Sequence, residues 1–146
     1  MRRRSLWGTL LAVSMALLLV VGTAPAATMS NDQLVSTRVA MMKENGRILR
    51  GAKRLSGAEA VAAASTVLKN FTTFPSLFPK GSLTPESRAT GKIWENWADF
   101  TKRMAEEKGN AQAMLAAAKA GDKGKYEAAI SALTRRCSSC HLTYGR

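Results

Sequence analysis

Five residues near the end of the chain, Cys137-Ser138-Ser139-Cys140-His141, constrain its fold more than any other stretch. They form a C-x-x-C-H pattern. On a helix, Cys137, Cys140 and His141 occupy positions i, i+3 and i+4, so all three project from one face. Two thiols at that spacing can each add to a vinyl group of one porphyrin, and the adjacent imidazole then reaches the iron. The pattern therefore predicts one covalently attached haem c, with Cys137 and Cys140 as its anchors and His141 as an iron ligand.

Three alternative interpretations of the two cysteines fit less well. A thioredoxin-like redox pair requires a βαβ context, and no strand pattern surrounds this motif. A zinc site requires about four ligands, and only three candidate residues cluster here. A disulfide between Cys137 and Cys140 would distort the helix that carries them. The chain contains two cysteines and one histidine, so the motif uses all of them.

Residues 1–26 have the features of a secretory signal peptide. Arginines at 2–4 precede an apolar run from Leu6 to Val21, and Ala24-Pro25-Ala26 offers a small-x-small cleavage site. The apolar run is shorter than the roughly 20 residues of a membrane-spanning helix. We therefore expect a periplasmic protein of residues 27–146, a single domain, with an uncleaved membrane anchor as the alternative. Export also fits the haem motif, since bacteria attach haem c outside the cytoplasm.

The chain is strongly basic, with 22 Lys and Arg against 10 Asp and Glu. Cleavage would remove three arginines, leaving 19 basic and 10 acidic residues, or a formal charge of about +9 before the haem propionates are counted. A basic surface attracts an acidic redox partner and speeds encounter. The basic residues are scattered over every predicted helix, without an aromatic platform among them. We expect redox protein partners, including acidic ones, no nucleic acid, and no membrane contact unless the signal is retained.

Four amphipathic segments predict four helices. The first opens at Ser30 or Asn31, either a good N-cap, and ends near Arg50. The second runs from Ser56 to about Thr73, and the third from between 85 and 91 to about 120. The fourth follows a break at 121–124. Helices joined by short connections predict an all-α, antiparallel up-and-down four-helix bundle that holds the haem between facing helices.

Each predicted helix has one apolar face, and the haem motif lies on that of the fourth. The loop at 74–82, with two prolines and a glycine, is also apolar, and we expect its aromatic side chains to be buried against the haem. The expected buried residues are Leu34, Val35, Met41, Met42, Ile48 and Leu49, then Val61, Ala64, Leu68 and Phe71, then Ile93, Trp97, Phe100, Met104, Ala111, Leu115 and Ala118, and finally Tyr126, Ile130, Leu133, Cys137, Cys140 and Tyr144.

Several short motifs occur in the order typical of one family. They are LFPxGS at 77–82, KIW at 92–94, AGD at 120–122, and an aromatic residue three places after the C-x-x-C-H motif. With a haem motif on the last of four helices, they resemble the class II c-type cytochromes, the cytochrome c′ family. The resemblance covers essentially the whole mature chain. It implies a four-helix haem protein that occurs as a monomer or as a homodimer packed through its first two helices.

The first helix resembles the low-spin members of that family, in which a methionine is the sixth iron ligand. The stretch MMKENGR at 41–47 carries this likeness, and Met42 matches the ligand position. The resemblance thus implies a mono-haem electron carrier with His141 and Met42 as axial ligands. The alternatives are a flexible core methionine at 42 and a five-coordinate protein that binds nitric oxide or carbon monoxide. We expect no enzyme activity, because the single histidine leaves no distal base.

Three further residues are candidates for haem contacts. Arg38 lies one turn before Met42 and would pair with a haem propionate, the alternative being an exposed arginine. Phe78 and Trp94 would contact the porphyrin or, alternatively, fill an ordinary core. The chain departs from the family at one place, since Gly145 stands where a basic residue usually follows the final aromatic.

Overall fold

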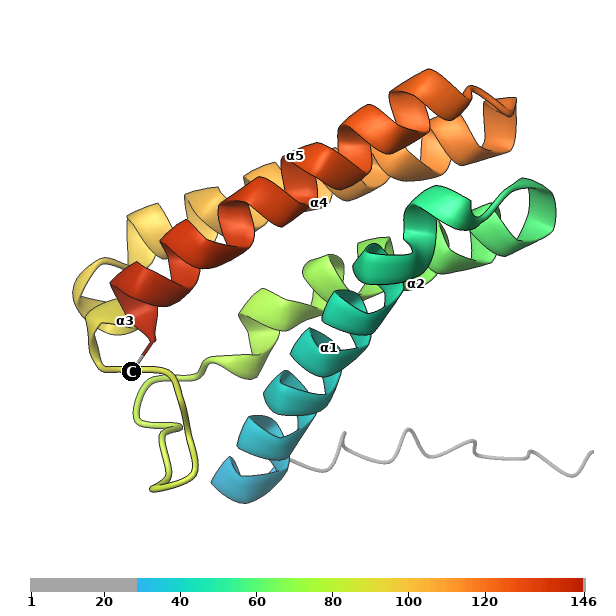
Figure 1. Cartoon of the computed structure of the whole chain (residues 1–146). Helices are drawn as coiled ribbons and strands as arrows, with labels where there is room; N and C mark the ends of the chain where they lie inside the picture. The colour runs from blue at the N-terminus through green and yellow to red at the C-terminus, as the bar shows by residue number, and fades with distance from the viewer. Residues whose placement is uncertain (1–28, 146) are drawn as a thin grey trace, which may run out of the picture.

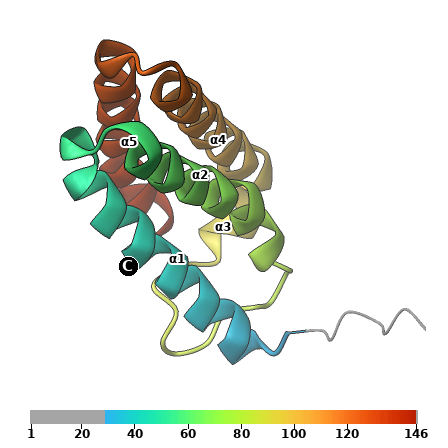
Figure 2. The same ribbon diagram turned by 90° about the vertical axis from the view of Figure 1, so that its right-hand side faces the viewer.

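The computed structural model describes residues 29–145, so the predicted signal peptide at 1–26 lies outside the described residues. The four long helices run side by side (Figures 1 and 2), with α1 and α2 in one layer and α4 and α5 in the other. The predicted all-α bundle is confirmed. Within the described residues the helices are α1 (Asn31–Gly51), α2 (Gly57–Thr73), α3 (Lys92–Glu95), α4 (Trp97–Ala120) and α5 (Lys123–Tyr144).

Local capping explains where the helices begin. The Ser30 hydroxyl accepts a 3.3 Å bond from the Gln33 amide, and the Gln33 side chain accepts a 2.8 Å bond from the Ser30 amide, which is a capping box. The first two predicted helices are confirmed. The fourth begins earlier than predicted, because Asp122 caps α5 by accepting a 3.0 Å bond from the Lys125 amide. Gly124 therefore lies in the first turn of α5 instead of breaking it.

The predicted continuous third helix is wrong, because the chain leaves helical geometry at Asn96 (φ −123°, ψ 42°). The Asn96 side chain donates a 3.2 Å bond to the Lys92 carbonyl, a local bond that competes with helix continuation. The break also corrects the prediction that Trp97 is buried. Its side chain is 41% exposed and stacks on Phe100, with ring centroids 5.5 Å apart.

The core is centred on α4, which packs against both α2 and α5, whereas α1 packs on α2 and on the turn Phe74–Leu77 that follows it. Small side chains let these helices approach closely, and Ala64 and Ala111 are fully buried. The buried Asn70 donates a 2.8 Å bond to the Asn45 side chain, linking α2 to α1. A satisfied polar pair in a core favours one register, so it fixes α1 against α2.

The apolar faces are largely as predicted, with a shift on α2. Ala60 and Val67, which were not predicted, are buried, while the predicted Val61 and Leu68 are half-buried. Met41 and Met42 on α1 are half-buried too. No helix within residues 29–145 is long and apolar enough to cross a membrane.

Candidate functional site

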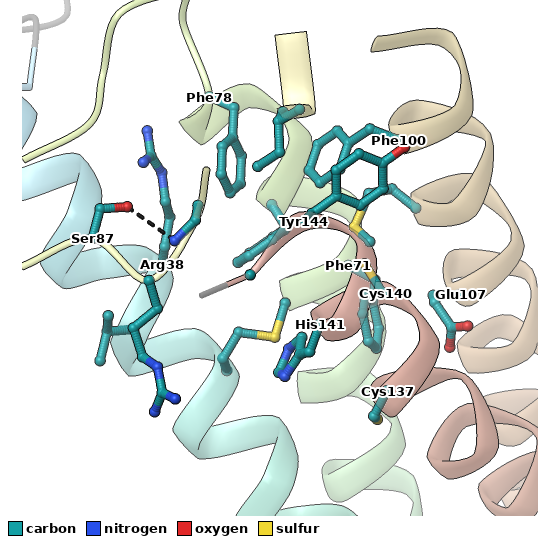
Figure 3. A pocket seen from close by; sticks show the side chains of 18 of the residues that line it. Arg38, Phe71, Phe78, Ser87, Phe100, Glu107, Cys137, Cys140, His141 and Tyr144 are labelled. Atoms are coloured by element: carbon teal, nitrogen blue, oxygen red, sulfur yellow. Dashed lines mark hydrogen bonds between the residues drawn. The ribbon is translucent and has the colours of Figure 1, made fainter. Parts of the chain in front are cut away.

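A cavity of about 430 Å³ lies between α1 and α5 (Figure 3). Its floor is aromatic and apolar, formed by Phe71 of α2, Phe74 and Phe78 of the turn that follows, and Phe100 and Met104 of α4. Phe78 packs edge-to-face on both Phe74 and Phe100, with centroid distances of 5.1 and 5.0 Å. The site is thus an apolar cavity with one wall formed by α1, near the start of the chain, and the opposite wall formed by α5, at its end.

The α5 wall carries the sequence motif. Cys137, Cys140, His141 and Tyr144 all line the cavity, and Figure 3 shows the His141 imidazole projecting from α5 towards α1. Both cysteines are free thiols, and the Cys137 thiol donates a 3.4 Å bond to the Leu133 carbonyl. Partial burial of the sulfur atoms against the cavity wall raises the pKa of both thiols, with a smaller contribution from Glu107, although Cys137 as a whole residue is exposed. Two neutral thiols therefore face the same space as the imidazole, as the spacing predicts.

Gly145 follows the motif where the family resemblance predicts a basic residue. Its amide donates a 2.8 Å bond to the His141 carbonyl, which ends α5. A Cβ atom at Gly145 would lie only 2.5 Å from the His141 carbonyl oxygen. The departure thus has a steric reason that sequence alone does not reveal, since the chain approaches itself too closely for a side chain.

Tyr144 ties the end of α5 to α4. Its hydroxyl donates a 2.6 Å bond to Asp99, which also accepts a 2.7 Å bond from Arg103. Burial and the bond to Asp99 raise the pKa of Tyr144 to about 12, so the hydroxyl stays a donor. The Thr90 amide donates a 2.8 Å bond to the Tyr144 carbonyl. These bonds hold the segment that carries His141 against its neighbours.

The α1 wall places Met42 and Arg38 on the same cavity. Arg38 is buried, which rules out the exposed arginine of the alternative. Its guanidinium donates 2.8 Å bonds to the Leu77 and Ser82 carbonyls and stacks 4.0 Å over the Phe78 ring. Burial lowers its pKa. Arg38 therefore fastens the 77–82 loop to α1 as well as lining the cavity.

Trp94 does not line the cavity, unlike the other candidates for haem contact. It is half-buried, and its indole donates a 3.1 Å bond to the Phe78 carbonyl. Trp94 thus lies behind Phe78. Met41, the neighbour of Met42, packs against the core outside the cavity lining.

Glu107 of α4 also lines the cavity, and sequence reasoning missed it. Only 7% of the residue is exposed, and neither carboxylate oxygen has a hydrogen-bond partner within the described residues. Burial raises its pKa from 4.5 to about 7. The sequence contains one indication that Glu107 is buried. It lies three residues after Met104 and four before Ala111, so it shares a helix face with these two core residues.

The donor set fits a haem c. Two unjoined thiols and an imidazole share one wall, a thioether and a buried guanidinium share the other, and aromatic rings lie between them. The thiols suit thioether attachment, the imidazole and thioether suit iron, and the guanidinium suits a propionate. A four-helix bundle with this site has the construction of a c-type haem protein.

Comparison with known proteins agrees. The family model described as Cytochrome C' matches residues 30–145. The chain is 36% identical over 117 residues to a cytochrome c-556 of Agrobacterium tumefaciens (strain II Chrys), covering 75% of this chain and 94% of that relative. The chain belongs to the cytochrome c′ family, whose members carry covalently attached haem c and serve as electron carriers or gas-binding haem proteins rather than typical enzymes.

Solved structures share the fold. A cytochrome c′ described as having a ligand-controlled dimer dissociation superposes with a TM-score of 0.73 at 22% identity, over 82% of this chain and 98% of that one. A nitrosyl complex of a variant cytochrome c′ from Alcaligenes xylosoxidans gives a TM-score of 0.69 at 22% identity, over 80% and 98%. At this identity the two likenesses show the bundle alone.

Proposed function

We propose that this protein is a periplasmic carrier of single electrons in which His141 and Met42 would be the two protein ligands of the iron of one haem c. The observation that carries the proposal is the placement of Met42 on α1 and His141 on α5, both lining one cavity. Cys137 and Cys140 would anchor the cofactor beside His141. When bound, haem c supplies an iron that accepts and releases one electron.

The two proposed ligands suit rapid electron transfer. An imidazole and a thioether are both neutral donors, so neither needs to gain or lose a proton to remain bound in either oxidation state. A methionine ligand raises the reduction potential in haem proteins. The Asn45–Asn70 bond lies within one turn of Met42, and the Tyr144–Asp99 bond lies within one turn of His141. Both ligands therefore stand on helix segments held in place by hydrogen bonds.

Arg38 and Phe78 would hold the porphyrin at the α1 side. Within the described residues, no carboxylate lies in ion-pair distance of the buried Arg38 guanidinium. A buried cation without an anionic partner is costly, and a haem propionate would offset that cost. Phe78, stacked under Arg38, would offer the porphyrin an aromatic edge. Trp94 would act through its bond to Phe78 rather than by contact.

Substitution of Met42 tests the proposed ligand. Met42→Ala should convert the ferric iron from low to high spin, as read by absorption and electron paramagnetic resonance spectra. Met41→Ala is the matched control, because the adjacent thioether lies outside the cavity lining, and its spectrum should match that of the wild type. A low-spin spectrum in Met42→Ala would mean that another residue is the sixth ligand.

Binding of nitric oxide or carbon monoxide to a five-coordinate iron is the second candidate function. The nitrosyl complex of the Alcaligenes xylosoxidans relative favours it, as does the half-burial of Met42, a flexible side chain. Carbon monoxide added to the ferrous protein at neutral pH separates the two functions. Slow or incomplete binding supports the Met42 ligand, whereas rapid and complete binding supports an open iron.

The surface around the cavity suits an acidic redox partner. Lys43, Arg88 and Arg136 all belong to its lining and are exposed, and the mature chain would be basic overall. Positive charge around the opening would steer a negatively charged protein towards the cofactor. Self-association as a homodimer is the other proposed contact, since a related cytochrome c′ is described as a dimer.

A further inference from the structure

Glu107 is the one buried carboxylate in the lining of the cavity, and the proposed electron transfer does not use it. Its side chain lies beside the segment of α5 that carries Cys137 and Cys140 (Figure 3). A buried carboxylate without hydrogen bonds is held poorly in its charged form. Such a group exchanges a proton readily when the charge beside it changes.

None of the charged and polar groups around Glu107 forms a close ion pair with its carboxylate within the described residues. The Arg136 guanidinium is 3.9 Å away through its Nε atom, beyond hydrogen-bond distance, and pairs closely with the exposed Glu106 instead. The Asn110 side chain and Arg136 favour the charged form, while burial and Glu106 oppose it more strongly. The Cys137 and Cys140 thiols face it from α5, and as thioethers they would no longer ionise.

The remaining charged groups of the cavity lie on other elements. They are Arg38 and Lys43 of α1 and Arg88 of the loop before α3. The Arg136–Glu106 pair adjoins Glu107, and Arg136 is exposed to solvent.

We propose that Glu107 is the proton-binding site of a proton-coupled electron carrier. The inference rests on the proposed electron-transfer function. When the protein takes one electron from its donor, Glu107 takes one proton from solvent, and one O–H bond forms on the carboxylate. When the protein gives the electron to its acceptor, that O–H bond breaks and the proton returns to solvent. The added electron favours the neutral acid, so the pKa of Glu107 is higher in the reduced protein than in the oxidised one.

Potentiometric titration of the holoprotein at a series of pH values tests this inference. Between the two pKa values of Glu107, the midpoint potential should fall as pH rises, because deprotonation disfavours reduction. One proton per electron corresponds to a tenfold change in the reduction equilibrium per pH unit, or a limiting slope of about 59 mV per pH unit. The expected window lies around neutral pH, given the pKa of about 7.

Two variants isolate the Glu107 contribution from that of the haem propionates. Glu107→Gln keeps the side-chain shape and removes the proton exchange, so it should flatten the slope near neutral pH. Glu106→Gln, at the neighbouring acid on the same helix, should keep a slope of the same size and shift its window to lower pH, because the Glu106 charge raises the pKa of Glu107. A potential that is independent of pH in the wild type, or an equal slope in Glu107→Gln, would overturn the inference.

Redox-difference infrared spectroscopy of the wild type provides a test that needs no variant. Reduction should produce the C=O stretch of a protonated carboxyl group, and its absence would contradict the inference. Spin-state spectra of the same samples report the proposed function separately. A high-spin iron with an intact pH slope would contradict the Met42 ligand and support the proton-binding role of Glu107. A low-spin iron without a slope would support the Met42 ligand and contradict the role of Glu107.

Discussion

The two halves of α5 have the same apolar spacing but different surroundings. In the first half, Tyr126, Ile130 and Leu133 are 3%, 1% and 0% exposed. In the second half, Cys137 is exposed and Cys140 is half-buried, although both continue the same face. The first half packs into the protein core, while the second half borders the cavity.

This difference shows what a helical period can and cannot predict. The spacing of apolar residues indicates which face of α5 turns inwards along its whole length. It does not indicate whether side chains or a cofactor fill the space in front of that face. In the second half, the residue types carry that information, because two cysteines and a histidine have a chemistry that leucine and isoleucine lack. The predictions that follow perturb one half at a time.

Loss of the haem anchors should have the largest effect, and it should fall on the second half. The double variant Cys137→Ser, Cys140→Ser should lack covalent haem, as shown by the mass of the denatured protein. Because burial against the haem would contribute about as much as the net stability of a domain, 5–15 kcal/mol, we expect no cooperative thermal unfolding. A variant that keeps a covalent haem, or unfolds like the wild type, would contradict the cofactor's place in the core.

Shortening a core side chain in the first half of α5 should destabilise the protein without altering the haem site. Leu133 is fully buried, so Leu133→Ala should lower the free energy of unfolding by about 2–5 kcal/mol in denaturant titrations. The visible spectrum should be unchanged. Leu142→Ala, at a side chain 84% exposed on the same helix, is the control and should have almost no effect. A spectral change in Leu133→Ala would show that the two halves are coupled.

A side chain at Gly145 should disturb the end of the second half. Gly145→Ala places a Cβ atom against the His141 carbonyl, and overpacking of this kind costs about 1–3 kcal/mol. We expect reduced stability together with a shift in the ferric absorption spectrum. Gly109→Ala on α4 meets no atom within 4 Å and should instead stabilise by about 0.5–1 kcal/mol. Equal stability and equal spectra in Gly145→Ala and Gly109→Ala would show that the C-terminal turn can accommodate a Cβ atom at position 145.

The smallest expected effect concerns Glu107, whose pKa is raised by burial. The unfolded chain releases this proton near pH 4.5 and the folded chain near pH 7, so folding stability falls as pH rises between these values. Glu107→Gln should remove this loss and gain on the order of 1 kcal/mol over the wild type above about pH 7. The gain should vanish below about pH 4.5, and chemical denaturation at both ends of the range measures it. A constant difference between the two proteins at all pH values would mean that ionisation is not its cause.

The sequence predicted the elements whose signals are local. The Ser30 capping box and the glycine after α4 mark helix ends through neighbouring atoms, and the haem motif needs only its own spacing. The break at Asn96 escaped prediction because the apolar residues Ile93 and Phe100 on either side keep helical spacing across it. The exposure of Trp97 follows from that break.

Features of the site that depend on tertiary contacts could not be predicted. The sequence predicts Arg38 as a haem contact, but its carbonyl partners in the loop lie 39 and 44 residues away. Glu107 belongs to a highly charged stretch of α4, and its burial appears only once α5 covers it. The steric need for Gly145 likewise depends on the final turn of the chain.

The spin state of the purified iron protein tests the central claim most directly. Absorption and electron paramagnetic resonance spectra of the ferric form, with absorption of the ferrous form, report whether a sixth ligand is present. We predict low-spin, six-coordinate iron in both oxidation states, as expected for His141 and Met42 together. High-spin, five-coordinate iron in both states would contradict the Met42 ligand and, with it, the proposed electron-carrier site.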